Sequence, residues 1–343
     1  MSQEVLAIIW FALWAVLWMV YFALDGYTLG TGILFPFLSK SKQEELQLQE
    51  TIGPYWNVNE VWVITAGGAT FAAFPLTYAL MFSYLYVPLF LILFALFFRA
   101  IGLEFMHKHE DPKWKTFWKW AFFAGSAAVA LLWGVAFANL FQGLLIDANG
   151  SSDTLLTLLN PYGLIGGLTF VSLFALSGSL WIAFKVKGDV EERAWKLSKT
   201  LWAVAAAIYG IFLIATAAMT PLLHNFVTYP VLFLVPALAL AALLLVRFYQ
   251  NKGRKLAAFL SLFGTILLTV ATGFIGLFPN MLLSKIDPKY SITLFQAAAS
   301  QKTLTIMFIV AVVMVPIIIA YQLWTYFLFK EKITIQNARG YHQ

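Results

Sequence analysis

The sequence contains no cysteine among its 343 residues. This absence excludes disulfides, thiolate metal sites, iron–sulfur clusters and covalently attached c-type haem. Charged residues are also scarce: they make up 11% of the chain, whereas soluble proteins carry about 25%. With 61% hydrophobic residues, the chain cannot cover a water-facing surface with polar groups. The composition therefore indicates an integral membrane protein.

Long apolar runs take the place of the missing charge. Each lasts about 20 residues or more, the length that crosses a hydrocarbon layer about 30 Å thick. We predict an all-α, polytopic helical bundle that forms a single transmembrane domain over residues 1–343. Its nine spans cover approximately residues 5–38, 58–79, 83–104, 118–142, 161–184, 200–221, 227–248, 256–279 and 303–329. The second and third spans require a tight hairpin near Ser83, and eight spans is the alternative if that hairpin is misread.

The basic residues predict the direction of the spans. Of the 22 lysines and arginines, only Lys285, Lys289 and Lys302 fall in predicted outer loops, which leaves nineteen inside. Such asymmetry places the N-terminus outside and the C-terminus in the cytoplasm, as in a multi-pass protein of a prokaryotic cytoplasmic membrane. The first apolar run lacks a basic leader and a cleavage site, so we interpret it as a retained helix. The net charge of +6 follows from these inner loops and does not indicate a nucleic-acid partner.

Three acids, Asp25, Glu60 and Glu104, fall within predicted spans, in the half nearer the cytoplasm. A charge in the bilayer interior is costly, so such residues usually face a cavity or a partner. All three are candidates for a proton pathway. Each also has a structural interpretation: Asp25 caps a bend in the first helix, Glu60 balances a helix dipole, and Glu104 pairs with Arg99 or extends to the inner surface.

Five glycines lie within the first two predicted spans. Gly26, Gly30 and Gly32 are predicted to share one face of the first span, and Gly67 and Gly68 lie mid-span in the second. We expect these glycines to allow close helix packing.

No histidine falls in a predicted span: two lie in a basic inner loop, one in an outer loop and one in the C-terminal tail. Because membrane haems are usually held by histidines on helices, we expect this chain alone to bind neither haem nor metal.

Two stretches carry a resemblance to a known family. Residues 22–37 are FALDGYTLGTGILFPF, and residues 52–75 are IGPYWNVNEVWVITAGGATFAAFP. Both resemble the signature stretches of subunit II of the cytochrome bd quinol oxidases. The chain length and the nine-span plan are also similar, so the resemblance extends over the whole chain.

The resemblance implies a respiratory complex that oxidises quinol, either menaquinol or ubiquinol, and reduces dioxygen to water. It places haem b and haem d in a homologous partner, subunit I. Subunit II then stabilises those haems and contributes a proton route, without a complete catalytic site of its own. Further small single-span subunits, membrane lipid and a quinone, as substrate or structural ligand, remain open as partners.

The family motifs map onto particular residues. Asp25 matches the acid of an Asp-Gly-aromatic motif, whereas Trp56, Asn59, Glu60 and Trp62 match the second motif.

The chain departs from the family motifs at two positions. Many family members have aspartate where this chain has Thr28 and Asn57, which can bind water but cannot carry charge. The leading alternative is a secondary transporter with intramembrane acids, but the internal repeat typical of that class is not evident.

Overall fold

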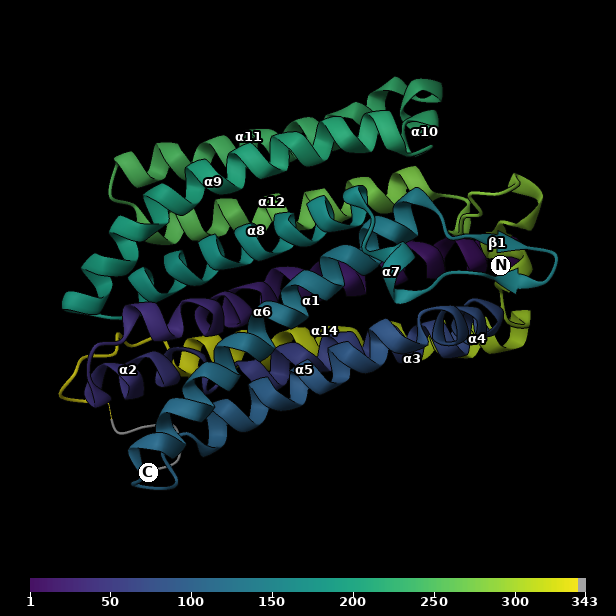
Figure 1. Cartoon of the computed structure of the whole chain (residues 1–343). Helices are drawn as coiled ribbons and strands as arrows, with labels where there is room; N and C mark the ends of the chain where they lie inside the picture. The colour runs from purple at the N-terminus through teal and green to yellow at the C-terminus, as the bar shows by residue number, and fades with distance from the viewer. Residues whose placement is uncertain (339–343) are drawn as a thin grey trace.

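The computed structural model describes residues 1–338, and Figure 1 shows a bundle of long helices. The long helices are α1 (Gln3–Leu38), α3 (Trp56–Ala73), α5 (Tyr86–Phe105), α6 (Pro112–Gln142), α8 (Pro161–Lys185), α9 (Asp189–Met219), α11 (Leu234–Asn251), α12 (Lys255–Leu277) and α14 (Gln301–Leu328). Arg339, one of the nineteen basic residues predicted inside, and His342, the histidine of the C-terminal tail, lie outside the described residues. An all-helical membrane fold is thereby confirmed.

Helix α1 forms the centre of the bundle. It packs against α3, α6, α8, α12 and α14, and most of its residues are buried. Its two ends give reference points for the molecule, the Gln3 end and the Leu38 end. The Ser2 side chain caps the first turn by accepting a hydrogen bond from the Val5 amide.

The glycines of α1 do not share one face, contrary to the sequence prediction. Gly26 and Gly30 face α8, where a methyl group on Gly30 would collide with the carbonyl of Phe174. Gly32 instead faces Ser126 on α6. The reason is geometric, because residues two apart point to nearly opposite sides of a helix. These glycines therefore lie close to two neighbouring helices, α8 and α6.

Gly67 and Gly68 of α3 contradict the packing prediction. A methyl group added to either would meet no atom within 4 Å among the described residues. Gly68 is exposed and Gly67 is half-buried. Within this chain, neither glycine supports a helix–helix contact.

Eight helices of the described chain have the length and hydropathy to cross a membrane. They correspond to the predicted spans except the second, residues 58–79. That stretch is divided between α3 and α4 (Pro75–Tyr84), which meet at Phe74. The break is caused by Pro75, because proline has no N–H to donate and disfavours a helical conformation in the residue before it.

Contacts along α3 fix its direction. The indole of Trp14 donates to the Thr70 hydroxyl at 2.7 Å, and the Asn59 amide donates to the Leu24 carbonyl at 3.1 Å. Helix α3 therefore runs antiparallel to α1. The Ala299 amide, just before α14, donates to the Ala73 carbonyl at 2.8 Å, so the end of α3 lies at the Gln3 end.

The short elements gather at the two ends of the bundle (Figure 1). The Gln3 end carries two small antiparallel ribbons and several short helices. These are β1 (Ile146–Asp147), β2 (Gly150–Ser151), α7 (Leu155–Leu158), α10 (Leu223–Thr228), η1 (Pro230–Phe233), β3 (Asn280–Leu282), η2 (Pro288–Tyr290), β4 (Ile292–Thr293) and α13 (Leu294–Ala297). They close the loops between the long helices.

Helix α2 (Lys42–Ile52) lies at the Leu38 end and was not predicted. The Gln47 amide donates to the carbonyls of Lys187 and Ile333, so α2 holds the chain after α8 and the chain after α14 together. Burial disfavours the charged form of Glu44, but hydrogen bonds from Arg193 and the Lys40 amide outweigh this effect and lower the pKa of Glu44. The helix is therefore anchored by an ion pair of 2.7 Å between Arg193 and Glu44.

Candidate functional site

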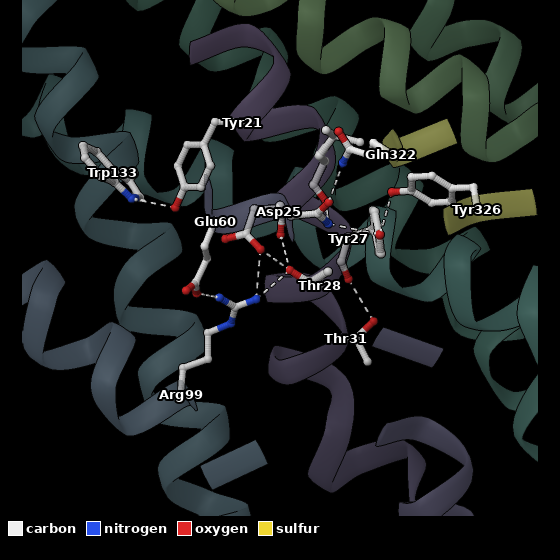
Figure 2. Close-up of polar contacts among 12 residues, drawn as sticks. Tyr21, Asp25, Tyr27, Thr28, Thr31, Glu60, Arg99, Trp133, Gln322 and Tyr326 are labelled. Atoms are coloured by element: carbon white, nitrogen blue, oxygen red, sulfur yellow. Dashed lines mark hydrogen bonds and ion pairs between the residues drawn. The ribbon is translucent and has the colours of Figure 1, made fainter. Parts of the chain in front are cut away.

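The polar centre of the bundle is built around Arg99 on α5 (Figure 2). Its side chain is only 1% exposed. One terminal nitrogen, Nη2, lies 2.9 Å from Asp25 Oδ1 and 2.6 Å from Thr28 Oγ1. The other, Nη1, forms an ion pair with Glu60 Oε1. A single guanidinium thus joins α1, α3 and α5, and we call Asp25, Thr28, Glu60 and Arg99 the Arg99 cluster.

The shape of guanidinium suits this role. Its planar fork directs several N–H donors toward separate acceptors, which a lysine ammonium on a flexible stem cannot reproduce. The Thr28 hydroxyl accepts from Arg99 and hydrogen bonds with Asp25, which lies one helical turn earlier. The Trp56 ring covers the cluster, with its centroid 5.9 Å from the Arg99 Cζ atom.

The charges of the Arg99 cluster do not balance when both acids are ionised. Two carboxylates then face one guanidinium, which leaves one negative charge in the bundle. Asp25 is 1% exposed and Glu60 19% exposed at the side chain. An uncompensated buried charge costs several kcal/mol. The Asp25 Oδ2 atom has no hydrogen-bond partner among the described residues. Two acids thus share one cation in the bundle interior.

A second hydrogen-bond network lies beside the cluster and reaches α14. The Asn59 amide donates to the Tyr27 hydroxyl at 3.1 Å, and that hydroxyl lies 2.8 Å from the Tyr326 hydroxyl. The Gln322 amide donates to Asn59 at 3.0 Å, and the Trp62 indole donates to Gln322 at 2.9 Å. This network fixes the rotation of α1, α3 and α14 around Asp25 and Glu60.

The sequence candidates separate into two groups. Asp25, Thr28 and Glu60 meet in the cluster, with Trp56 against it. Asn57, by contrast, is exposed on the outer side of α3.

Glu104 lies further along α5, five residues beyond Arg99, and is half-buried. The cluster therefore takes its acids from α1 and α3. Asn59 and Trp62 of the second family motif belong to the neighbouring network.

Arg99 is the site residue whose position the sequence analysis misjudged. The sequence predicts it among the inner-loop basic residues, but it is buried in α5 against Asp25 and Glu60. The sequence did indicate a buried position for Arg99, because it is the one charged residue in the apolar run 86–103. Removing it from the inner-loop set leaves eighteen basic residues there against three, so the asymmetry persists.

No group of three or more histidine, cysteine, aspartate or glutamate side chains suited to a metal ion occurs within residues 1–338. His224 lies on the short helix α10, and His107 and His109 follow α5. Burial lowers the pKa of His107, although Glu45 opposes this shift.

The fold and the cluster define a multi-pass helical membrane protein that encloses paired acids around one arginine. Comparison with known proteins makes the assignment specific. Residues 6–329 match the family described as Cytochrome bd terminal oxidase subunit II, and the chain belongs to this family. It is therefore a subunit of a cytochrome bd quinol oxidase complex.

Curated relatives match over nearly their full length. The chain is 34% identical to Cytochrome bd-I ubiquinol oxidase subunit 2 of Escherichia coli, covering 98% of this chain and 97% of that one. It is 32% identical to Cytochrome bd ubiquinol oxidase subunit 2 of Bacillus subtilis, with coverage of 97% and 98%. A chain of the bd oxidase structure from Geobacillus thermodenitrificans superposes with a TM-score of 0.78 at 14% identity, covering 95% of this chain and 100% of that chain.

Proposed function

We propose that this chain acts beside a homologous subunit I that holds haem b and haem d, in a complex that oxidises ubiquinol or menaquinol and reduces dioxygen to water. The curated relatives are named as ubiquinol oxidase subunits, which supports this reaction. Within residues 1–338, the histidines lie outside the span-length helices, which supports placing the haems in the partner. Subunit II would then stabilise the haem-bearing partner and supply protons to it.

The Arg99 cluster carries the proton proposal. Reduction of dioxygen to water consumes protons, and protons drawn from one side of the membrane make the reaction electrogenic. Two acids that share one arginine can alternate between a singly and a doubly ionised state, because the arginine keeps its charge throughout. The cluster would thus take up one proton and pass it on, with Asp25 and Glu60 as its carriers and Thr28 as the hydroxyl between Asp25 and Arg99.

The depth of the cluster suits uptake from the Leu38 end. Asp25 lies thirteen residues before the end of α1, which is about 20 Å along the helix axis. We infer that this end faces the cytoplasm and that the N-terminus lies outside, because the basic loops gather at the Leu38 end. A multi-pass position in a prokaryotic cytoplasmic membrane follows.

We further propose nine crossings, with α3 and α4 together forming the second. Helix α3 returns the chain from the Leu38 end to the Gln3 end, where its last residue contacts Ala299. Together the two helices contain 28 residues, about 42 Å of helix, which exceeds the thickness of a hydrocarbon layer. Each segment alone, 18 residues in α3 and 10 in α4, is shorter than the other spans.

The first test replaces Asp25 by asparagine in the intact complex. Asp25→Asn keeps the side-chain shape and an oxygen for Arg99 but removes the titratable group. We expect quinol-dependent oxygen uptake to fall about 10-fold or more, in the range that a lost proton-transfer group costs, while the reduced-minus-oxidised haem spectrum stays normal. Glu60→Gln should act in the same direction.

Glu192→Gln provides the matched control, since Glu192 is an exposed acid in the first turn of α9. It should leave oxygen uptake unchanged. Loss of the haem bands in Asp25→Asn would make Asp25 structural, and unaltered uptake would remove it from the proton route. The family match favours this function over a secondary transporter, which would instead show substrate-driven uptake in vesicles.

A further inference from the structure

A cavity of about 380 Å³ opens between α12 and α14 near the Leu38 end. Its inner wall is formed by Tyr27 of α1 and Trp181 of α8, with Phe259 of α12 and Tyr326 of α14 at its sides. The lining is apolar over most of its length. Because the site lies at the bundle surface between these two helices, we call it the α12–α14 groove.

The outer rim of the groove lies on the surface of this chain. Leu260 of α12 is 55% exposed and Leu323 of α14 is 64% exposed. The groove is therefore open at an apolar surface and floored by aromatic rings. Such a shape accepts a flexible apolar chain more readily than a folded protein segment.

Two lysines stand at the Leu38 end of the groove. Lys185 is only 3% exposed, and its ammonium donates to the carbonyls of Phe329 and Glu331, the latter at 3.2 Å. An ammonium has three donors, so one N–H of Lys185 is not taken up by these two carbonyls. The nitrogen also lies 5.9 Å from the Tyr55 ring centroid and 5.8 Å from that of Trp181, both in the groove lining. Lys330 is exposed above the Phe327 ring, 4.2 Å from its centroid. Within residues 1–338, no carboxylate lies within 4.0 Å of either ammonium.

We propose that the α12–α14 groove binds one anionic phospholipid. Its phosphate would be held between Lys185 and Lys330, and one acyl chain would lie along Phe259, Phe263 and Tyr326. The charge arrangement selects this occupant. Within residues 1–338, two cations with no carboxylate within 4.0 Å lie at the Leu38 end of the groove, and basic pockets between membrane helices commonly bind anionic lipid. A zwitterionic lipid would bring a second cation toward the lysines.

The proposal is independent of the oxidase chemistry, and its test does not use turnover. The purified complex is reconstituted with phosphatidylglycerol that carries a photoreactive diazirine in one acyl chain, or with the matched phosphatidylcholine. After illumination, cross-linked peptides are mapped by mass spectrometry. We expect phosphatidylglycerol to label residues 256–263 and 323–330, and to do so several-fold more than phosphatidylcholine.

Variants at the lysines separate binding from general lipid contact. Lys330→Gln should reduce phosphatidylglycerol labelling of the groove about five-fold, which corresponds to about 1 kcal/mol per basic residue near an anionic surface. Lys185→Gln combined with Lys330→Gln should bring it to the phosphatidylcholine level. Lys302→Gln, at the opposite end of α14, is the control and should change nothing.

Among the described residues, the exposed Lys330 ammonium contacts the Phe327 ring and forms no ion pair, so Lys330→Gln remains interpretable if the double variant is unstable. Equal labelling by the two lipids in the wild-type complex would overturn the proposal. The same conclusion follows if Lys330→Gln labels as strongly as wild type, or if a quinone and no phospholipid is recovered from the groove.

Discussion

At the scale of single residues, Arg99 determines the chemistry of the bundle interior. Its guanidinium is the only cation in contact with Asp25 and Glu60 among the described residues. The three side chains come from three helices, so the arginine is both a counter-ion and a cross-link. A residue that sequence reasoning placed near the inner surface therefore organises the candidate site.

Replacing Arg99 by methionine should destabilise the protein strongly. The change leaves two carboxyl groups facing each other in a buried site, and removal of one partner of a buried ion pair typically costs about 3–5 kcal/mol. We expect a lower midpoint of thermal unfolding and weak accumulation in membranes. Arg99→Met combined with Asp25→Asn should recover part of that loss, and failure to recover would argue against charge as the cause.

Glycines give a second prediction at this scale. Gly30→Ala places a methyl group against the Phe174 carbonyl, where the backbone of α8 must move. Overpacking of this kind costs about 1–3 kcal/mol. Gly68→Ala, where no described atom lies within 4 Å, should be neutral or slightly stabilising through helix propensity. Thermal unfolding of both variants, measured side by side, tests the difference; equal effects would contradict the close α1–α8 contact.

At the scale of elements, hydropathy predicted most of the helices because a span must be apolar over its whole length. Helix α2 was missed for the opposite reason. It is polar, and its position depends on Gln47 reaching carbonyls near residues 187 and 333, which sequence spacing does not reveal. The helix break at Phe74 could have been predicted from the sequence, because Pro75 lies inside the predicted second span.

The absence of cysteine makes the second crossing directly testable. Ser41, before α2, and Ser83, near the end of α4, are both exposed. Ser83→Cys should react with a membrane-impermeant maleimide in intact cells, whereas Ser41→Cys should react only after the membrane is opened. Labelling of both residues from the same side would show that α3 and α4 do not cross.

Ser152 and Ser300, exposed in the loops of the Gln3 end, serve as references for the outer side. Their cysteine variants should behave like Ser83→Cys. If instead they label only in opened membranes, the proposed orientation is inverted. The unmodified protein supplies the blank, because it has no thiol to react.

At the scale of the whole molecule, the family resemblance read from two stretches was confirmed by matches along nearly the entire chain. The candidate acids Asp25 and Glu60 were also identifiable, because charge inside an apolar run is rare and therefore informative. Their common partner, Arg99, could not be identified from the sequence, because a linear pattern does not show which helices lie side by side. The separation of Asn57 from the cluster could not be predicted either, because it depends on the rotation of α3 about its axis.

Purification of the intact assembly tests the proposed division of labour. Affinity capture of this chain in mild detergent should bring down a larger homologous subunit, with b- and d-type haem bands and quinol-dependent oxygen uptake. The chain expressed without that partner should be colourless. Haem bands in the chain alone would overturn the assignment of the haems to subunit I.

The order of the Arg99 cluster along the chain bears on how the protein is made. Asp25 and Glu60 leave the ribosome before Arg99, so the first two hydrophobic segments enter the membrane carrying acids whose cation has not yet been synthesised. Each of those segments then carries the cost of an unpaired acid, a few kcal/mol on insertion scales, until α5 arrives. We therefore expect the first hundred residues to reach their stable arrangement in the membrane together, once α5 brings its arginine.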